Sequence, residues 1–330
     1  MNSQMAAQLD NVIQVQDLKK SFGEVHAVKG IDFEVRMGEI FGFLGPNGAG
    51  KTTTINLLIG LARPESGSIQ ISGINSTSDP KKIQHLIGVV PDESSLYPEL
   101  TGFDNLRFCA SLYGMRKAER GKKARALLEE FSLSEAGDRL FAGYSKGMKR
   151  RLTIAAGIIH DPQILFLDEP TSGIDVASAR SIRRKLQILN EAGKTIFLTT
   201  HYIEEAERLC HRVAFIVEGR IVRVDTMENL LHPVRGKHML LLSYQHPKNF
   251  NAKAFSEKHQ GITFQQLSGG QIRLESTKPI RISAVIPFFE DQGMEVTEAR
   301  VIHPSLEEVF VDITGLDSAH MQKEKKGNGK

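Results

Sequence analysis

Apolar and polar side chains follow two different periods over residues 12–233. Residues 12–17 and 31–36 alternate as half-buried strands do, while the continuous apolar runs at 40–44 and 164–167 are typical of strands covered on both faces. The remaining elements are predicted as helices over 52–60, 148–159, 176–190 and 202–209, and as strands over 194–200 and 212–217. Because short strands alternate with helices, we predict an α/β domain with parallel strand pairing.

The pattern changes after residue 233. The predicted elements are a strand at 238–244, a helix at 252–259, strands at 262–266 and 271–275, a helix at 281–291, a strand at 294–302 and a helix at 305–315. The first six follow the order β-α-β-β-α-β, a ferredoxin-like pattern. We therefore expect an N-terminal extension (1–11), the larger α/β domain (12–233), a small accessory α+β domain (234–315) and a flexible Lys-, Gly- and Asn-rich tail (316–330).

Composition narrows the possible functions. With 330 residues and 40% apolar side chains, the chain is large enough for two folded domains. Its 42 Lys and Arg residues nearly balance 39 Asp and Glu residues, and a net charge of +3 is too small to imply nucleic-acid binding by itself. Cys109 and Cys210 lack metal-ligand spacing and are expected to be reduced thiols. No stretch approaches the ~20 apolar residues of a membrane helix, and the first residues lack a secretory-signal pattern.

A phosphate-binding motif follows the apolar run at 40–44. GPNGAGKT, Gly45 to Thr52, fits the pattern G-x-x-x-x-G-K-[ST] and precedes a predicted helix, which is the context that this motif requires. Its glycines let backbone N–H groups turn onto phosphate oxygens, and the helix start adds a favourable dipole. Lys51 can meet the β- and γ-phosphates, and the Thr52 hydroxyl can bind Mg²⁺.

A second apolar run ends in two acids. ILFLDEPTSGID, at 164–175, delivers the carboxylates of Asp168 and Glu169 to the C-terminal edge of a parallel sheet, where α/β proteins bind ligands. We expect Asp168 to hold Mg²⁺, directly or through water, and Glu169 to polarise the attacking water. Together the two motifs predict a protein that hydrolyses a nucleoside triphosphate.

Three further stretches give a family resemblance. YSKGMKRR at 144–151 resembles the L-S-G-G-Q signature of ABC-type ATPases, SGID at 172–175 resembles their D-loop, and TTH at 199–201 resembles the segment with their switch histidine. All three occur in the family's order. In such proteins the signature lies at a helix start and contacts the ATP held by a second subunit. Ser145 precedes the helical run at 148–159 as an N-cap would.

The resemblance implies a role for each matching position. Phe22, in KSFG, stands where an aromatic ring stacks on adenine. The residues implied to line the phosphates are Gly45, Asn47, Gly48, Gly50, Lys51, Thr52 and Thr53. Ser145 and Gly147 would reach the ATP of the opposite subunit. Asp175 would communicate across the dimer, and His201 would sense the γ-phosphate. ATP and Mg²⁺ are thus the implied substrate and cofactor.

Two positions depart from the family pattern. Asp92, in VVPDE, stands where most members carry Gln; its carboxylate can bind Mg²⁺ through water, but it adds negative charge beside a triphosphate. Lys146 replaces the first glycine of the signature, a change compatible with phosphate attraction. Lys149, Arg150 and Arg151 follow on the predicted helix, where we expect solvated side chains.

Together with these variants, the C-terminal PSLEEVFVDITG at 304–315 resembles the ATPase subunits of type-2 ABC exporters. Members of that subfamily work with a separate membrane permease. The permease's coupling helices meet a region corresponding to about 92–115, within the helical signature subdomain at about 92–160. The resemblance therefore implies two partners, a second copy of this chain and a permease, and a peripheral location on the cytoplasmic face of the inner or plasma membrane.

Two alternatives are weaker. A soluble ABC ATPase that acts on nucleic acid or ribosomes is supported best by RKAERGKKAR at 116–125. That stretch has the mixed charge of a solvated helix face, so no nucleic-acid partner is expected. A GTPase or small-molecule kinase would leave the signature, the D-loop and the histidine unexplained, and the chain has no N-K-x-D guanine motif.

Overall fold

The computed structural model describes residues 11–232, 236–245, 250–267, 269–302 and 305–316. The chain divides into two compact units, Met1–Met227 with Ile313–Lys330, and Glu228–Asp312. The expected N-terminal extension and C-terminal tail fall almost entirely outside the described residues. Among those residues, no helix combines the length and apolar character needed to cross a membrane.

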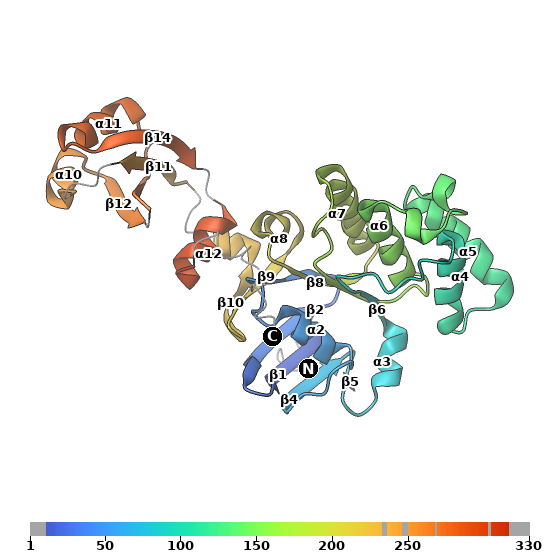
Figure 1. Ribbon diagram of the computed structural model, residues 1–330. Helices are drawn as coiled ribbons and strands as arrows, with labels where there is room; N and C mark the ends of the chain where they lie inside the picture. Colours follow the sequence, from blue (N-terminus) through green and yellow to red (C-terminus); the bar gives the residue numbers. More distant parts are fainter. Residues whose placement is uncertain (1–10, 233–235, 246–249, 268, 303–304, 317–330) are drawn as a thin grey trace. The chain divides into compact units, whose positions relative to one another are not determined.

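The larger unit contains a six-stranded sheet with the strand order β10-β9-β3-β8-β7-β6 (Figure 1). Its strands, in chain order, are β3 (Ile40–Leu44), β6 (Ile87–Val90), β7 (Ile164–Asp168), β8 (Thr195–Thr200), β9 (Arg212–Val217) and β10 (Arg220–Thr226). All neighbours pair in parallel except β9 and β10. Every residue of β3 and β7 is buried, as the continuous apolar runs at 40–44 and 164–167 predicted, and every residue of β8 is buried as well.

A second sheet in this unit is antiparallel and has the order β2-β1-β4-β5. It consists of β1 (Asn11–Phe22), β2 (Val25–Arg36), β4 (Ser66–Ile71) and β5 (Ile74–Asn75). The prediction of parallel pairing was therefore wrong for the first two strands. Two residues separate β1 from β2, and a connection this short permits only a hairpin, because parallel neighbours need a long crossover.

The core of the larger unit lies between the two sheets. Phe33 of β2 packs against Phe43 of β3 and Phe197 of β8, with ring centroids 5.5 and 5.9 Å apart. All three rings are buried. This packing fixes the ends of the parallel strands, where the candidate site lies.

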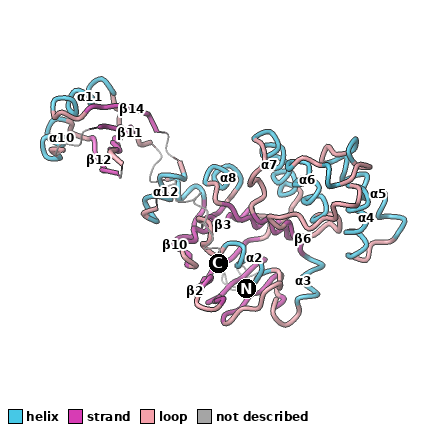
Figure 2. Tube along the Cα trace, viewed as in Figure 1, coloured by secondary structure: helices cyan, strands magenta, loops and turns pink. Residues whose placement is uncertain are grey.

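Helices complete the larger unit, as Figure 2 shows in cyan. They are α2 (Lys51–Leu58), α3 (Pro80–Leu86), α4 (Gly102–Leu112), α5 (Lys117–Glu130), α6 (Lys146–Gly157), α7 (Val176–Glu191) and α8 (Ile203–Leu209). Helices α4, α5 and α6 pack on one another, and α6 also contacts β6 and α7. The three form a helical region of the kind expected around the signature.

The smaller unit has the predicted β-α-β-β-α-β order. Its elements are α9 (Met227–Leu231, at the boundary), β11 (His238–Gln245), α10 (Ala252–Lys258), β12 (Ile262–Leu267), β13 (Gln271–Ser276), α11 (Ile282–Asp291), β14 (Glu295–Ile302) and α12 (Leu306–Thr314, which crosses the boundary). The sheet order is β12-β13-β11-β14, and every pair is antiparallel, which is the ferredoxin-like arrangement. Phe255 of α10 and Phe289 of α11 pack with Leu242 of β11 in its core.

Candidate nucleotide-binding and catalytic site

The phosphate-binding loop connects the buried strand β3 to helix α2. Gly50, directly before the helix, has a φ of 104°, a conformation that side chains strongly disfavour. A Cβ atom on Gly50 would lie 2.4 Å from the carbonyl oxygen of Ala27, so a larger residue would also collide with backbone. Glycine is therefore required at this position, and the loop can present its N–H groups at the start of α2.

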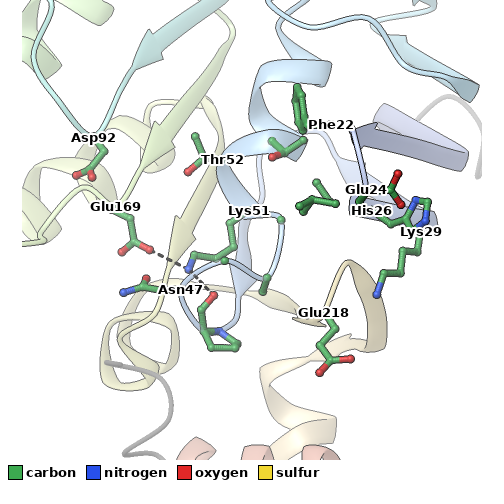
Figure 3. A pocket seen from close by; sticks show the side chains of 17 residues that line it. Phe22, Glu24, His26, Lys29, Asn47, Lys51, Thr52, Asp92, Glu169 and Glu218 are labelled. Carbon is green, nitrogen blue, oxygen red and sulfur yellow. Dashed lines mark hydrogen bonds and ion pairs between the residues drawn. The ribbon is translucent and has the colours of Figure 1, made fainter. Parts of the chain in front are cut away.

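A cavity of about 740 Å³ opens at this loop (Figure 3). The predicted site residues that line it are Phe22, Asn47, Gly48, Gly50, Lys51, Thr52, Thr53, Asp92 and Glu169. Phe22, at the end of β1, is 55% exposed and thus free to stack on a ligand. The lining residues that we did not predict are Glu24, Val25, His26, Ala27, Lys29, Pro46, Ala49 and Glu218. Most of these come from the β1–β2 hairpin, whose two-residue turn was the available signal.

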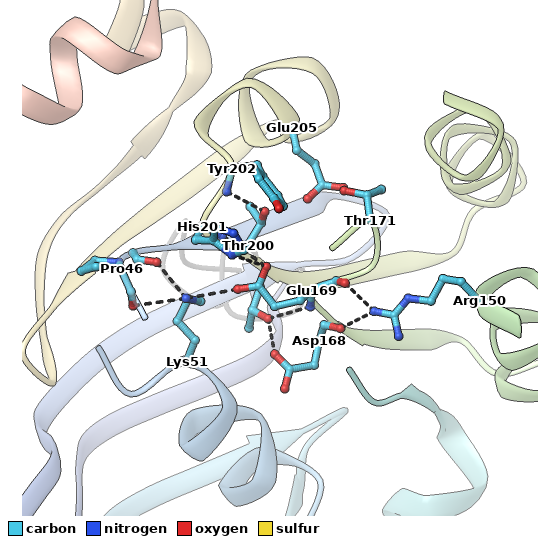
Figure 4. Close-up of polar contacts among 12 residues, drawn as sticks. Pro46, Lys51, Arg150, Asp168, Glu169, Thr171, Thr200, His201, Tyr202 and Glu205 are labelled. Carbon is cyan, nitrogen blue, oxygen red and sulfur yellow. Dashed lines mark hydrogen bonds and ion pairs between the residues drawn. The ribbon is translucent and has the colours of Figure 1, made fainter. Parts of the chain in front are cut away.

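Lys51 contacts both the phosphate-binding loop and Glu169, as Figure 4 shows. Its ammonium group donates hydrogen bonds to the carbonyl oxygens of Gly45 (2.8 Å) and Pro46 (3.2 Å). The same group lies 3.2 Å from Oε1 of Glu169. Gly45 thus contributes a carbonyl that holds Lys51. A phosphate that binds Lys51 must compete with the Glu169 carboxylate.

Glu169 is held between two partners at the end of β7. Its Oε2 atom is 2.8 Å from Nδ1 of His201, while Oε1 faces Lys51. Burial by itself raises the pKa of the carboxyl, but the hydrogen bond from His201 and the charge of Lys51 outweigh it, and the net pKa is lowered. Glu169 also has a φ of 49°, a strained backbone conformation of the kind that gathers at functional sites. Both proposed catalytic residues, Glu169 and His201, therefore lie in direct contact.

Asp168 is oriented by the neighbouring strand. The parallel register places Asp168 opposite Thr199, whose hydroxyl donates to Oδ1 of the carboxylate. The Thr199 hydroxyl also accepts a hydrogen bond from the N–H of Glu169, at 3.2 Å. We did not predict a role for Thr199. The available signal was its position two residues before His201, in a predicted strand.

Arg150 corrects the expectation of a solvated side chain. It is buried, and its guanidinium donates to the carbonyl oxygens of Pro91, Asp92, Asp168, Glu169 and Pro170. Arg151 donates to the carbonyl oxygens of Phe131 and Ser132. Lys149 lies over the ring of Phe141. Helical periodicity could not show which of these residues would point toward the strand ends.

Asp92 lines the cavity and is exposed, at the start of the loop that follows β6. The surrounding protein still desolvates its carboxyl and raises the pKa, and the negative charges of Asp168 and Glu169 act in the same direction. The charge of Arg150 opposes this shift. The carboxylate thus belongs to a cluster of acids around a buried guanidinium.

Ser145, Gly147 and Asp175 lie together, and none of them lines the cavity. Ser145 caps α6 as predicted, because its hydroxyl accepts the N–H of Met148 at 3.2 Å. Asp175 caps α7 by accepting the N–H of Ser178 at 2.8 Å. A Cβ atom on Gly147 would lie 2.2 Å from Oγ of Ser178. The glycine therefore lets these two capped helix starts approach closely, with Ser145 and Asp175 exposed.

The oxygen donors in and beside the cavity suit a magnesium ion: Thr52 and Asp92 line it, and Asp168 lies outside its lining. Thr52 exposes its hydroxyl at the start of α2, and the carboxylates of Asp168 and Asp92 come from two neighbouring strand ends. Hydroxyl and carboxylate oxygens are ligands that Mg²⁺ accepts. In nucleotide sites the ion takes one or two carboxylates and completes its shell with phosphate oxygens and water. The residues present therefore fit the ion that the resemblance implies.

Comparisons with known proteins agree with this geometry. The family model described as ABC transporter matches residues 28–172. The chain is 34% identical over 309 residues to the linearmycin resistance ATP-binding protein LnrL of Bacillus subtilis (strain 168), covering 92% of this chain and 98% of that protein. It is also 34% identical over 312 residues to the daunorubicin/doxorubicin resistance ATP-binding protein DrrA of Streptomyces peucetius, covering 94% of each. A Nod factor export ATP-binding protein of Burkholderia pseudomallei (strain K96243) is 42% identical over 309 residues, with 92% of this chain and 97% of that protein covered.

Solved structures show the same fold. An ATP-binding subunit of an ABC transporter superposes with a TM-score of 0.62 at 30% identity, covering 68% of this chain and 93% of that one. A dimeric ATP-binding cassette in a post-hydrolysis state bound to ADP and Pi superposes with a TM-score of 0.61 at 27% identity, covering 65% of this chain and 98% of that one. The chain belongs to the ABC transporter family, among the ATPases of its type-2 exporter subfamily.

Proposed function

We propose that this chain is the nucleotide-binding subunit of an exporter, and that it forms a head-to-tail homodimer around ATP. One arrangement carries the proposal. Lys51 and Glu169 line the cavity and His201 contacts Glu169, whereas the exposed starts of α6 and α7 lie outside the cavity. A single chain thus offers a phosphate site and, separately, an exposed Ser145 next to the buried Gly147. Two copies in opposite orientation would bring each signature to the other copy's phosphate site, and a dimeric cassette is among the structural relatives.

The proposed cycle begins with ATP binding in the cavity. Phe22 stacks on the adenine, and the N–H groups at the start of α2 receive the phosphates. Lys51 exchanges its contact with Glu169 for the β- and γ-phosphates. Ser145 and Gly147 of the second copy then close over the γ-phosphate, and Asp175 lies at the interface between the copies.

Hydrolysis follows in the closed dimer. Glu169, freed from Lys51 and still held by His201, accepts a proton from water as the oxygen attacks the γ-phosphorus. The bond between the γ-phosphorus and the bridging oxygen breaks, and ADP and phosphate leave. Mg²⁺ held by Thr52 and Asp168, with Asp92 through water, would neutralise phosphate charge when bound. His201 keeps the carboxylate pointed at the γ-phosphate.

We propose that hydrolysis powers a separate membrane permease. The relatives are named for resistance to linearmycin and daunorubicin and for Nod factor export, which supports an exporter. The helical region offers a docking surface: Tyr97 and Leu112 are exposed, and Tyr97 packs edge-on against the partly exposed Phe108 with ring centroids 5.2 Å apart. The subunit would then lie on the cytoplasmic face of the membrane, bound through the permease.

Glu169→Gln tests the core of the proposal. The variant cannot accept the proton, so ATP turnover should fall by about 100-fold or more while ATP binding survives. Dimers should accumulate with ATP, as measured by size-exclusion chromatography with light scattering. Glu204→Gln, which changes an exposed acid that pairs with Arg208 outside the cavity lining, is the matched control and should turn over normally. Wild-type turnover in Glu169→Gln, or a monomer at all ATP concentrations, would refute the proposal.

A further inference from the structure

Every nitrogen of the Arg150 guanidinium donates hydrogen bonds to main-chain carbonyl groups. Nε donates to Pro170 at 2.9 Å, and Nη1 donates to Asp92 at 3.0 Å and also to Pro91. Nη2 donates to Asp168 and Glu169. An arginine has five N–H donors in a rigid planar fork, and here they meet five carbonyl oxygens.

These carbonyl groups belong to two separate segments. Pro91 and Asp92 follow β6, while the other three residues begin at the last position of β7. Arg150 itself lies on α6, five positions after Ser145, the residue that caps the same helix. One buried side chain therefore connects the signature helix to the backbone of Glu169 and to the loop of Asp92.

Arg150 also offsets the negative charge of nearby carboxylates. The carboxylates of Asp92, Asp168, Glu169 and Glu205 all interact electrostatically with the guanidinium. The charge of Asp92 adds to those of Asp168 and Glu169, the two acids at the end of β7. A buried cation next to them offsets the repulsion within this group.

We propose that Arg150 is a positioning residue, which fixes the backbone of Glu169 and of Asp92 to the signature helix and balances the negative charge of Asp92. When a second copy engages Ser145, α6 carries the resulting movement to Glu169 through this side chain. The proposal rests on the proposed function, in which Glu169 is the base and the signature meets another copy's ATP. It adds a residue that touches neither ATP nor the attacking water.

Lysine is the most informative substitution. Arg150→Lys keeps the positive charge but replaces the planar guanidinium with one ammonium group. Its three N–H donors share a single nitrogen atom, so they cannot reach the carbonyl groups of both segments at once. A misplacement of about 1 Å at a catalytic group can cost about 100-fold in rate. We expect kcat for ATP to fall 10- to 100-fold, with KM changed less than about threefold. Because Ser145 and the phosphate site are intact, this variant should still form ATP-dependent dimers.

Arg151→Lys is the matched control. Arg151 is the next residue on α6, and its guanidinium donates only to Phe131 and Ser132, at the end of α5, among the contacts of the described residues. This variant removes a similar link between helices without touching the strand ends. It should keep kcat within about twofold of wild type, because the half-buried Arg151 contacts neither strand end among the described residues.

Two further variants test whether Arg150 balances the negative charge of Asp92. They also keep the inference testable if Arg150→Lys does not fold. Arg150→Gln alone leaves the acids uncompensated, so we expect lower kcat and a lower melting temperature than in Arg150→Lys. Adding Asp92→Gln removes one negative charge, and the double variant should regain part of both losses. Non-additivity of this kind is the sign of a direct coupling between two residues.

The outcomes separate cleanly. Wild-type kcat in Arg150→Lys, equal loss in Arg150→Lys and Arg151→Lys, or no recovery in the double variant would overturn the inference. If neither Arg150→Lys nor the double variant folds, Arg150 maintains the fold and the positioning role is rejected. If Glu169→Gln retains turnover or forms no dimers, the proposed function fails instead, whatever the Arg150 variants do.

Discussion

The ammonium group of Lys51 lies 3.2 Å from Oε1 of Glu169, and the two side chains are only 6% and 10% exposed. In the proposed cycle, the cation that binds phosphate and the carboxylate that accepts a proton therefore share one contact. Because Lys51 also lowers the pKa of Glu169, the carboxylate is ionised before the substrate arrives. Phosphate binding would draw Lys51 away and expose the base only when the substrate is in place.

Replacing Lys51 tests whether its ammonium group binds phosphate. Lys51→Met removes the charge-assisted contacts to phosphate, each worth about 1.5–3 kcal/mol, so ATP affinity should fall by about 10- to 100-fold. Titration with a fluorescent ATP analogue measures the change. Lys185→Met is the control, because Lys185 pairs with Glu130 away from the cavity. Unchanged affinity in Lys51→Met would show that phosphate binds elsewhere.

Ser145 should be needed for dimer closure but not for ATP binding by the monomer. Ser145→Ala removes the N-cap of α6, at a cost of about 1 kcal/mol, and also the hydroxyl offered to the second copy. ATP-dependent dimers and turnover should be lost while nucleotide titration stays near wild type.

Thr101→Ala separates those two effects. Thr101 caps α4 by accepting the N–H of Asp104 at 3.0 Å, so its loss has a similar effect on a helix start. It should lower the melting temperature about as much as Ser145→Ala and leave dimer formation intact. Equal loss of dimers in both variants would mean that helix stability, and not the signature hydroxyl, controls closure.

The burial of Glu205 predicts that the stability of the fold depends on pH. The residue is buried in α8 and accepts a hydrogen bond from Thr171 at 2.6 Å. Burial raises its pKa above the usual 4.5, and the charge of Glu169 adds to the shift. An acid whose folded pKa is raised contributes stability below its unfolded pKa, and that contribution is lost as pH rises through the folded pKa.

Glu205→Gln should remove this dependence, because the amide stays neutral. From pH 5 to pH 8, the free energy of unfolding of the variant should rise relative to that of wild type. Urea denaturation at both pH values measures this difference. Glu204→Gln changes the exposed neighbour, which pairs with Arg208, and should show no such gain. A difference between Glu205→Gln and wild type that does not vary with pH would contradict the assignment.

The sequence predicted the residues that line the cavity better than those that hold them in place. The loop from Gly45 to Thr52 and the acids after β7 have fixed spacings, because backbone turns and strand ends dictate where their atoms go. Ser145 was also predictable as a helix cap, since capping is a local interaction. Arg150 was not, because its partners are 58 or more positions away in one segment and about 20 away in the other. The antiparallel sheet was missed because helix-and-strand alternation begins only after the β1–β2 hairpin.

Thr199 provides the last test, on the orientation of Asp168. Thr199→Val keeps the shape of a fully buried strand residue but removes the hydroxyl that donates to the carboxylate. The carboxylate should then hold Mg²⁺ less well, since partners of a metal ligand typically matter 10- to 100-fold for affinity or activity. ATP turnover measured against Mg²⁺ concentration should need about tenfold more Mg²⁺ to reach half its maximum. Thr195→Val, on the same strand, removes a hydroxyl that accepts the N–H of Gly38 at 2.9 Å, far from the acids. If both variants show the same Mg²⁺ dependence, Thr199 supports the strand and not the ligand.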